Sequence, residues 1–290
     1  MITLTRPEGS KPGDLDVSRR GLAGLFFAGY AVAAVSAQAE PIATDASGLV
    51  TETVSLPNGL PAFVARPAGK GRHPAVIVVS EIFGVHEYIR DVARRLAKAG
   101  YVAIAPAFFH RAGDPAGLSD FPAIMKIVAT ATDAQVQGDL TATIQWLRAQ
   151  PFTGKGKLGI TGFCWGGAVV WMAAAAHKDI GAGVAWYGRL AVPPKPAETD
   201  PTRKYPIQVV SALQAPVLGL YGGTDQGIPL ETVEALRAEL AAKGPKGSQI
   251  VVYPESQHGF HADYRPSYDP IAAADGWARL LAHFKANGVG

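Results

Sequence analysis

Short apolar runs alternate with helical patterns along most of this chain, and this alternation constrains the fold more than any other feature. The clearest run, Ala75–Val79, follows His73-Pro74 and contains no polar residue. Runs of this kind are typical of strands that are buried on both faces of a parallel sheet. Similar runs are present at Tyr101–Ala105, Lys157–Thr161, Gly183–Tyr187, Val217–Tyr221 and Gln249–Tyr253.

Helical patterns separate these runs. In His86–Ala99, apolar residues recur on one face, and Gly100 provides a stop signal. Further helices are predicted at Gln135–Ala149, Trp165–His177, Leu230–Lys243 and Pro270–Ala286. Strands that alternate with helices build βαβ units and a sheet with helices on both faces. The predicted fold class is therefore α/β, with a mostly parallel central sheet.

Three connecting segments stand out. Val50–Leu56 and Leu60–Arg66 flank Pro57-Asn58-Gly59, a turn signal that predicts an N-terminal hairpin. Ala191–Lys204 is rich in proline and charge and is interpreted as a surface loop. Ala107–Thr132 is a longer insertion with room for a short helix. Long loops at strand ends are usually functional or mobile, and whether this one acts as a lid is left open.

Composition excludes several classes of protein. A chain with 48% hydrophobic and 18% charged residues is not disordered. A net charge of +3, without a run of Lys or Arg, gives no support to nucleic-acid binding. The single cysteine excludes an internal disulfide and a cysteine-rich metal site. The sequence also does not place three His or Asp ligands together, so no metal and no cofactor are expected.

Residues 1–39 have the layout of a secretory signal. A polar stretch ends in Ser18-Arg19-Arg20, Gly21–Ser36 carries no charge, and Ala37-Gln38-Ala39 resembles a cleavage site. The paired arginines are similar to the bacterial twin-arginine motif. The alternative, an uncleaved membrane anchor, would need about 20 apolar residues, more than this run provides. We expect cleavage of residues 1–39, one mature domain over 40–290, export by the twin-arginine machinery, a periplasmic location and no stable membrane anchor.

The only cysteine lies in a sequence pattern that favours reactivity. Residues 157–161 form a predicted strand, Gly162-Phe163-Cys164-Trp165-Gly166 follows it, and a helix begins directly afterwards. This is the nucleophile-elbow pattern with Cys in place of Ser. Glycines two positions away make room for the strained turn, and the helix dipole favours an anion at Cys164. The amide of Trp165 would supply one oxyanion-hole donor. The alternative is that Cys164 is a small buried apolar residue.

An elbow also predicts the chain order of its partners, first an acid and then a histidine. Asp225 ends the Gly-rich turn after Val217–Tyr221, and His258 lies in the loop after Gln249–Tyr253. Asp225 could instead cap its turn, and His258 could be a solvated loop residue. His261 competes for the same role but lies deeper, past the turn. We predict that His258 takes the thiol proton, Asp225 orients the imidazole, and Cys164 attacks an ester carbonyl.

From about Thr51 to the C-terminus, the chain resembles the dienelactone hydrolases, α/β-hydrolases with a Cys-Asp-His triad. The resemblance rests mainly on Gly162–Gly167 and on Ser80-Glu81-Ile82-Phe83-Gly84. It implies hydrolysis of a small-molecule ester or lactone without a cofactor. It also implies that Glu81 holds Cys164 unreactive until substrate arrives, and that Ile82 supplies the second oxyanion donor. The alternative for Glu81 is an acid near a helix start.

In the family, two arginines hold the carboxylate of a butenolide substrate. The resemblance places the first at Arg111, five residues after Pro106. The position of the second is occupied by Ala262, so this sequence departs from the pattern there. Arg265 is close in sequence, and whether it substitutes is left open. A carboxylate clamp depends on arginine geometry, so the identity of the natural substrate is also left open.

Two other functions remain as alternatives. One is a general carboxylesterase or thioesterase acting on uncharged esters, with Phe83, Phe108, Phe109, Trp165 and Tyr187 as candidate pocket residues or core. The other is a non-catalytic thiol sensor, since an exposed reactive thiol is prone to oxidation. A sensor needs neither Asp225 nor His258, so the ordered triple favours the hydrolase. The oligomeric state is not indicated by the sequence.

Overall fold

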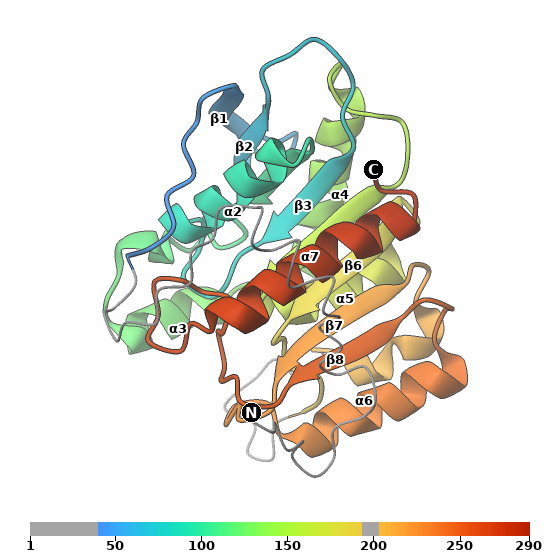
Figure 1. Ribbon diagram of the computed structural model, residues 1–290. Helices are drawn as coiled ribbons and strands as arrows, with labels where there is room; N and C mark the ends of the chain where they lie inside the picture. Colours follow the sequence, from blue (N-terminus) through green and yellow to red (C-terminus); the bar gives the residue numbers. More distant parts are fainter. Residues whose placement is uncertain (1–39, 193–202) are drawn as a thin grey trace, which may run out of the picture.

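The computed structural model describes residues 40–192 and 203–290. This part of the chain forms an eight-stranded sheet with the order β1-β2-β4-β3-β5-β6-β7-β8 (Figure 1). The strands are β1 Leu49–Ser55, β2 Pro61–Pro67, β3 Ala75–Val79, β4 Val102–Pro106, β5 Leu158–Phe163, β6 Ile180–Trp186, β7 Val217–Gly222 and β8 Gln249–Tyr253. Pairings from β4 through β8 along this order are parallel, whereas β1–β2 and β2–β4 are antiparallel.

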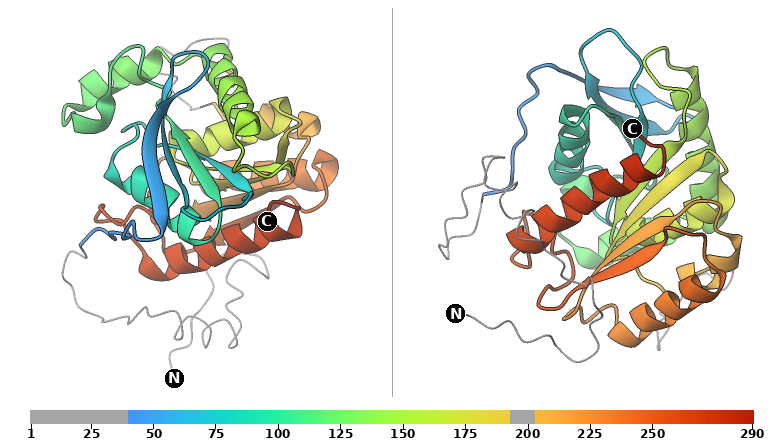
Figure 2. Two further views of the ribbon diagram at one scale, coloured as in Figure 1. Left: turned by 90° about the horizontal axis from the view of Figure 1, so that it is seen from above. Right: turned by 45° about the vertical axis from the view of Figure 1, so that its right-hand side comes forward.

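Helices cover both faces of the sheet (Figure 2). On one face lie α2 (Glu87–Lys98) and α7 (Pro270–Ala286), and on the other lie α4 (Asp133–Ala149) and α5 (Trp165–Ala176). Helix α6 (Leu230–Lys243) contacts β8. The predicted α/β class, with a mostly parallel sheet between two helical layers, is confirmed.

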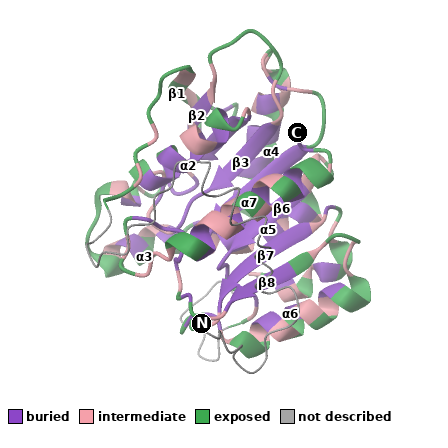
Figure 3. Cartoon of the chain, viewed as in Figure 1, coloured by how far each residue is buried: buried purple, intermediate pink, exposed green. Residues whose placement is uncertain are grey.

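The central strands are buried on both faces, as their apolar sequences predict. Every residue of β3, β4 and β5 is buried. Figure 3 shows these strands enclosed, with the exposed residues concentrated on the outer sides of the helices. The core therefore fixes the positions at which the central strands end.

The winding of the chain predicts where a ligand binds. After β3 the chain adds β4 on one side, and it then adds β5 on the other side of β3. Because the direction of winding reverses there, the loops that follow β3 and β5 diverge and leave a crevice at the carboxyl ends of these strands. The segments that begin at Ser80 and Cys164 follow those two ends.

The peripheral predictions have different outcomes. The N-terminal hairpin is confirmed, with Leu49 opposite Pro67 and Ser55 opposite Pro61. The Ala107–Thr132 insertion contains a 3₁₀ turn, η1 (Pro115–Gly117), and helix α3 (Phe121–Ala129). Most of the predicted 191–204 loop and all of the predicted 1–39 signal lie outside the described residues. In the described ranges, we find no helix with the length and apolar character needed to cross a membrane.

Candidate active site

Cys164 occupies a strained turn between β5 and α5. Its φ of 55° lies in the left-handed region, which residues other than glycine rarely adopt. Its backbone N–H donates to the Trp186 carbonyl at 3.0 Å, which fixes the turn against β6. The side chain is partly exposed and unbonded to another cysteine. The thiol is therefore presented at the N-terminus of α5, as the elbow pattern predicts.

Glycines make this turn possible because backbone segments approach one another closely. A Cβ on Gly162 would lie 2.4 Å from the Gly166 carbonyl oxygen. A Cβ on Gly166 would lie 2.4 Å from the Val79 carbonyl oxygen. Both distances are shorter than van der Waals contact, so the Gly-x-Cys-x-Gly spacing is a packing requirement between β3 and α5.

Replacing Gly166 with alanine is expected to lower the free energy of unfolding by about 3 kcal/mol, because the methyl group overlaps backbone atoms of β3. Gly138→Ala is the control. Gly138 is exposed in α4, and a Cβ added there would meet no neighbouring atom within 4 Å, so alanine should raise stability by about 0.5 to 1 kcal/mol. Urea unfolding of the two variants checks both values. An unchanged midpoint for Gly166→Ala would contradict this account of the elbow.

The strand register brings two further candidates beside the cysteine. Val79 of β3 pairs with Gly162 of β5. Glu81 and Cys164 each come two residues after this pair, and Ile82 and Trp165 each come three residues after it. The structure thus places the predicted thiol-regulating residue and both predicted oxyanion donors at the same edge of the sheet.

Asp225 and His258 meet at that edge from the ends of β7 and β8. Asp225 Oδ2 lies 2.7 Å from His258 Nδ1. Asp225 Oδ1 accepts hydrogen bonds from the amides of Gly227 and Ile228 at 2.8 and 3.1 Å. Asp225 therefore both caps its turn and binds the histidine. The sequence allowed either a turn cap or a histidine partner at this position. The two are compatible, because Oδ1 accepts from the turn amides and Oδ2 contacts His258.

The charge of His258 is stabilised by its neighbours. Burial alone would lower its pKa, but hydrogen bonds with Asp225 and with Cys164 raise the pKa to about 10. The Tyr187 ring lies edge-on to the imidazole, with centroids 5.2 Å apart. Asp225 is hydrogen-bonded to His258, and Cys164 is near enough to contribute to the raised pKa of the imidazole.

Glu81 is fully buried and is surrounded by groups that stabilise its charge. Tyr264 donates to Glu81 Oε2 at 2.6 Å. His86 Nε2 lies 3.6 Å from the same oxygen, and Arg265 Nη2 lies 3.4 Å from Oε1. Burial would raise the pKa of Glu81, yet these three neighbours lower it below its ordinary value. Glu81 is therefore a buried carboxylate with two potential cations beside it.

A pocket of about 620 Å³ opens beside this carboxylate. Its polar wall includes His86, Tyr264 and Arg265, together with Gln257, the residue that precedes His258. Its apolar wall consists of Phe83, Pro115, Ala116, Leu118 and Pro266. Glu81 and Tyr264, and to a smaller extent Cys164, raise the pKa of Arg265 against the effect of burial. The pocket thus suits a small molecule with an anionic group and an apolar part.

The two arginines of the sequence analysis lie in different surroundings. Arg111 makes a two-pronged ion pair with Asp139, at 2.9 and 2.7 Å, and is not among the residues that line this pocket. Arg265 lies in the pocket wall and contacts Glu81. Ala262 is fully buried. The carboxylate-binding role predicted for Arg111 stays a prediction, and Arg265 is the arginine that faces the pocket.

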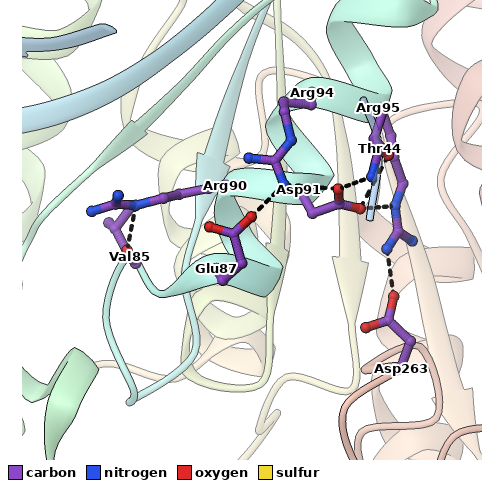
Figure 4. Close-up of polar contacts among 8 residues, drawn as sticks. All are labelled: Thr44, Val85, Glu87, Arg90, Asp91, Arg94, Arg95 and Asp263. Atoms are coloured by element: carbon purple, nitrogen blue, oxygen red, sulfur yellow. Dashed lines mark hydrogen bonds and ion pairs between the residues drawn. The ribbon is translucent and has the colours of Figure 1, made fainter. Parts of the chain in front are cut away.

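The loop that carries His258 and Arg265 is anchored to α2. Tyr88 and His261, both buried, are hydrogen-bonded at 2.7 Å, and burial keeps the pKa of His261 well below its ordinary value. Arg95 bonds to Asp263 and also to Asp91 (Figure 4). His261 is therefore a structural residue rather than a rival of His258, and α2 holds the loop in position over the sheet.

The aromatic residues considered for the pocket divide into two groups. Phe108, Phe109 and Tyr187 are buried in the core. Phe83 and Trp165 are partly exposed, and Phe83 lines the pocket. Trp165 packs against Phe109, with centroids 4.8 Å apart. Most of this set therefore belongs to the core rather than to the pocket.

Comparison with known proteins agrees with this fold. A relative from Methylorubrum extorquens, named "Putative carboxymethylenebutenolidase", is 46% identical over 279 residues, which is 94% of each chain. An Escherichia coli K12 protein with the same name is 43% identical, over 90% of this chain and 96% of its own. The crystal structure named "Putative Dienelactone Hydrolase" from Klebsiella pneumoniae has a TM-score of 0.76 and 46% identity. It covers 82% of this chain and 98% of that one.

The fold and the site define a hydrolase with an α/β-hydrolase fold. More narrowly, the model of the "Dienelactone hydrolase family" matches residues 60–288, and the chain belongs to that family. The enzyme class and the fold predicted from the sequence are thereby confirmed.

Two pocket residues, His86 and Tyr264, are not identified by the sequence patterns. His86 lies outside the position expected for a catalytic histidine, and no motif includes Tyr264. Both belong to short segments next to recognised motifs, Ser80–Gly84 and the His258 loop. Proximity to those motifs is the available signal, but it does not show which side chains turn toward Glu81.

Proposed function

We propose that this chain hydrolyses a small ester or lactone, of the dienelactone type, through a thiol ester on Cys164. The observation that carries the proposal is the 2.7 Å bond between Asp225 and His258, beside a cysteine held in a strained elbow that also contributes to the raised pKa of His258. Each of the three residues comes from a different strand end, so the packed sheet holds them in place before substrate arrives.

In the first half of the reaction, the Cys164 thiolate attacks the carbonyl carbon while His258 holds the thiol proton. The carbonyl oxygen becomes an anion that the amides of Ile82 and Trp165 stabilise. Collapse of this intermediate breaks the ester C–O bond, and His258 gives its proton to the departing oxygen. The acyl group is left on sulfur, and for a lactone the departing oxygen stays on the same molecule.

In the second half, His258 takes a proton from water, and the resulting hydroxide attacks the thiol ester. The C–S bond breaks, and Cys164 returns to its starting state with His258 protonated. Asp225 keeps the proton-bearing Nδ1 of His258 toward itself, which leaves Nε2 free for the exchange in both halves. We also propose that Glu81, aligned with Cys164 by the strand register, controls the reactivity of the thiol.

We assign the substrate carboxylate to Arg265. Its guanidinium lies in the pocket wall, stacks 5.1 Å from the Phe83 ring centroid, and is near Cys164. The names of the relatives, which refer to carboxymethylenebutenolide and dienelactone hydrolysis, agree with a carboxylate-bearing lactone. Arg265 would thereby replace the second carboxylate-binding arginine of the family, whose position is occupied by Ala262 in this chain.

Arg265→Gln is expected to lower kcat/KM for dienelactone by about 100-fold, because a charge-assisted hydrogen bond to the substrate carboxylate is lost. The loss for dienelactone methyl ester, which lacks the charge, should be at least tenfold smaller. For dienelactone, the kcat/KM of Arg265→Lys should lie between the values of the wild type and Arg265→Gln. Lysine keeps the positive charge but lacks the planar guanidinium. Arg90→Gln, which changes an arginine of a separate pocket, is the control. Equal losses on the two substrates would contradict the assignment.

A general esterase that acts on uncharged esters is the second candidate. The apolar wall of the pocket favours it, because Phe83, Pro115 and Leu118 offer contact to a neutral acyl chain. Faster turnover of the methyl ester than of dienelactone by the wild-type enzyme would support this candidate. A thiol sensor predicts instead that neither compound is hydrolysed.

We further propose that residues 1–39 direct export by the twin-arginine route to the periplasm, with residues 40–290 as the mature domain. The paired arginines, the uncharged run and the Ala37-Gln38-Ala39 site support this proposal. The double change Arg19→Lys and Arg20→Lys is expected to retain the protein in the cytoplasm of a bacterial host. Fractionation followed by mass measurement tests it, and a mature chain that does not begin at Glu40 would contradict the cleavage site.

A further inference from the structure

His86 is a titratable residue that the proposed reaction does not use, although it lies at the centre of the pocket wall. It is the N-cap of α2, and Nε2 points toward Glu81 at 3.6 Å. Its ring stacks on Tyr88 and meets Tyr264 edge-on, with centroids 5.9 and 5.1 Å apart. Three aromatic or charged neighbours therefore fix the position of the imidazole.

Two polar atoms in this cluster lack a hydrogen-bond partner within the described part of the chain. They are Nε2 of His86 and Oε1 of Glu81, and both are buried. Oε1 of Glu81 still has its ion pair with Arg265 at 3.4 Å, whereas a buried imidazole nitrogen without a hydrogen bond is unfavourable and calls for an explanation. The separation of 3.6 Å between His86 and Glu81 is too long for a strong hydrogen bond but short enough for an ion pair if His86 is protonated.

The balance of charge changes when an anion enters the pocket. Before that, the permanent cation within ion-pair distance of the fully buried Glu81, among the described residues, is Arg265. A substrate carboxylate on Arg265 would place two negative charges beside one positive charge, and one of the two belongs to the fully buried Glu81. Such an arrangement strongly favours the uptake of a proton by the nearest group able to accept one.

In this cluster, the imidazole of His86 is the side chain that can be either neutral or cationic. The charged and titratable residues facing it are Glu81 from the β3–α2 connection, Tyr88 from α2, and Tyr264 and Arg265 from the loop after β8. Burial holds the pKa of Tyr88 and Tyr264 above the ordinary value, and that of Arg265 is raised by Glu81 against the effect of burial. The pKa of Glu81 is lowered. Glu81 and Arg265 therefore stay charged, and the two tyrosines stay neutral, when an anion enters the pocket.

We propose that His86 takes up a proton when an anionic substrate binds at Arg265, so that His86 becomes the second cation of the site and selects for anionic substrates. This inference rests on the proposed function only in that the substrate carboxylate occupies this pocket. It assigns His86 a role in binding, distinct from the proton transfers of His258.

The test compares dienelactone with its methyl ester between about pH 6 and pH 9. Any effect of pH on the proposed catalytic groups acts on both substrates alike. The KM for dienelactone divided by the KM for its methyl ester therefore isolates the contribution of the carboxylate. For the wild-type enzyme, we expect this ratio to be constant at low pH and to rise by up to about tenfold per pH unit at higher pH, as the uptake of one proton requires. In His86→Gln the ratio should be independent of pH and close to the high-pH value of the wild type.

His110→Gln is the matched control, because His110 is exposed and lines a different pocket. It should keep the pH dependence of the wild type. A ratio that does not change with pH in the wild type, or a pH dependence that survives in His86→Gln, would overturn the proposal. If neither substrate is hydrolysed, the proposed function fails instead, so the two failures are distinguishable.

Calorimetry provides a second measurement should His86→Gln not fold. Dienelactone is titrated into the Cys164→Ala variant near pH 7.5 in two buffers of different ionisation enthalpy. We expect a net uptake of protons, up to one for each molecule bound, and none for the methyl ester. Binding of dienelactone without proton uptake would exclude His86 as the linked group.

Discussion

Replacing Cys164 with alanine is expected to lower kcat/KM for dienelactone by about 10⁵-fold. The proposed reaction has no nucleophile without the thiol, and only the oxyanion donors and substrate binding remain to accelerate hydrolysis. The substitution removes one sulfur atom from a partly exposed position, so the fold should be retained. Steady-state hydrolysis, corrected for the spontaneous reaction, measures the loss.

Thermal unfolding of Cys164→Ala is the accompanying control, since loss of activity counts only if the variant folds like the wild type. Cys164→Ser is a second comparison that retains a hydroxyl nucleophile at the same position. A Cys164→Ala enzyme with more than about one-tenth of wild-type activity would require a nucleophile other than Cys164 and would contradict the proposed reaction.

Asp225→Asn is expected to lower kcat/KM by about 10⁴-fold. The carboxylate accepts the Nδ1 proton of His258, whereas an amide can donate to Nδ1 and stabilise the tautomer that blocks Nε2. The same change keeps the oxygen that accepts hydrogen bonds from Gly227 and Ile228, so the turn should survive. The variant therefore separates the orienting role of Asp225 from its structural role.

Asp114→Asn is the matched control for this variant. Asp114 also accepts a backbone hydrogen bond, from Ala116 at 2.9 Å, but it has no contact with His258 in the described structure. Its activity should stay within about twofold of the wild type. Loss of Asp225 should also lower the pKa of His258 from about 10, which NMR titration of the imidazole can follow. An unchanged kcat/KM in Asp225→Asn would contradict the triad.

Much of the fold follows from the apolar pattern, and the differences have local causes. Helix α4 begins at Asp133 rather than at the predicted Gln135, because Thr132 caps it by accepting from the Gln135 amide. Strand β6 begins at Ile180 rather than at Gly183. Gly181 interrupts the apolar run there because a Cβ would lie 2.4 Å from the Lys157 side chain. The first cause is a cap within the same turn of helix, whereas the second is a contact between segments distant in the sequence.

The candidate site was predictable where a motif fixes both residue type and chain position. The elbow and the order of its partners identified Cys164, Asp225 and His258, and the structure brings them together. The pocket wall was not predictable in the same way. Arg265 faces Glu81 because the loop after β8 folds back onto α2, and no local pattern encodes that contact. His86 faces Glu81 through the course of the short β3–α2 connection that carries both residues. Arg111 fits the family spacing, but its ion pair with Asp139 depends on the position of α4.

The acyl-enzyme itself tests the central claim most directly. Wild-type enzyme is mixed with an excess of p-nitrophenyl acetate, quenched in acid within the first turnovers, and digested for mass spectrometry. The account predicts an acetyl group on the peptide that contains Cys164, the only cysteine of the chain, and its release as a thiol ester by neutral hydroxylamine. Turnover with no acetyl group on this peptide, or with the acetyl group on another residue, would contradict the account.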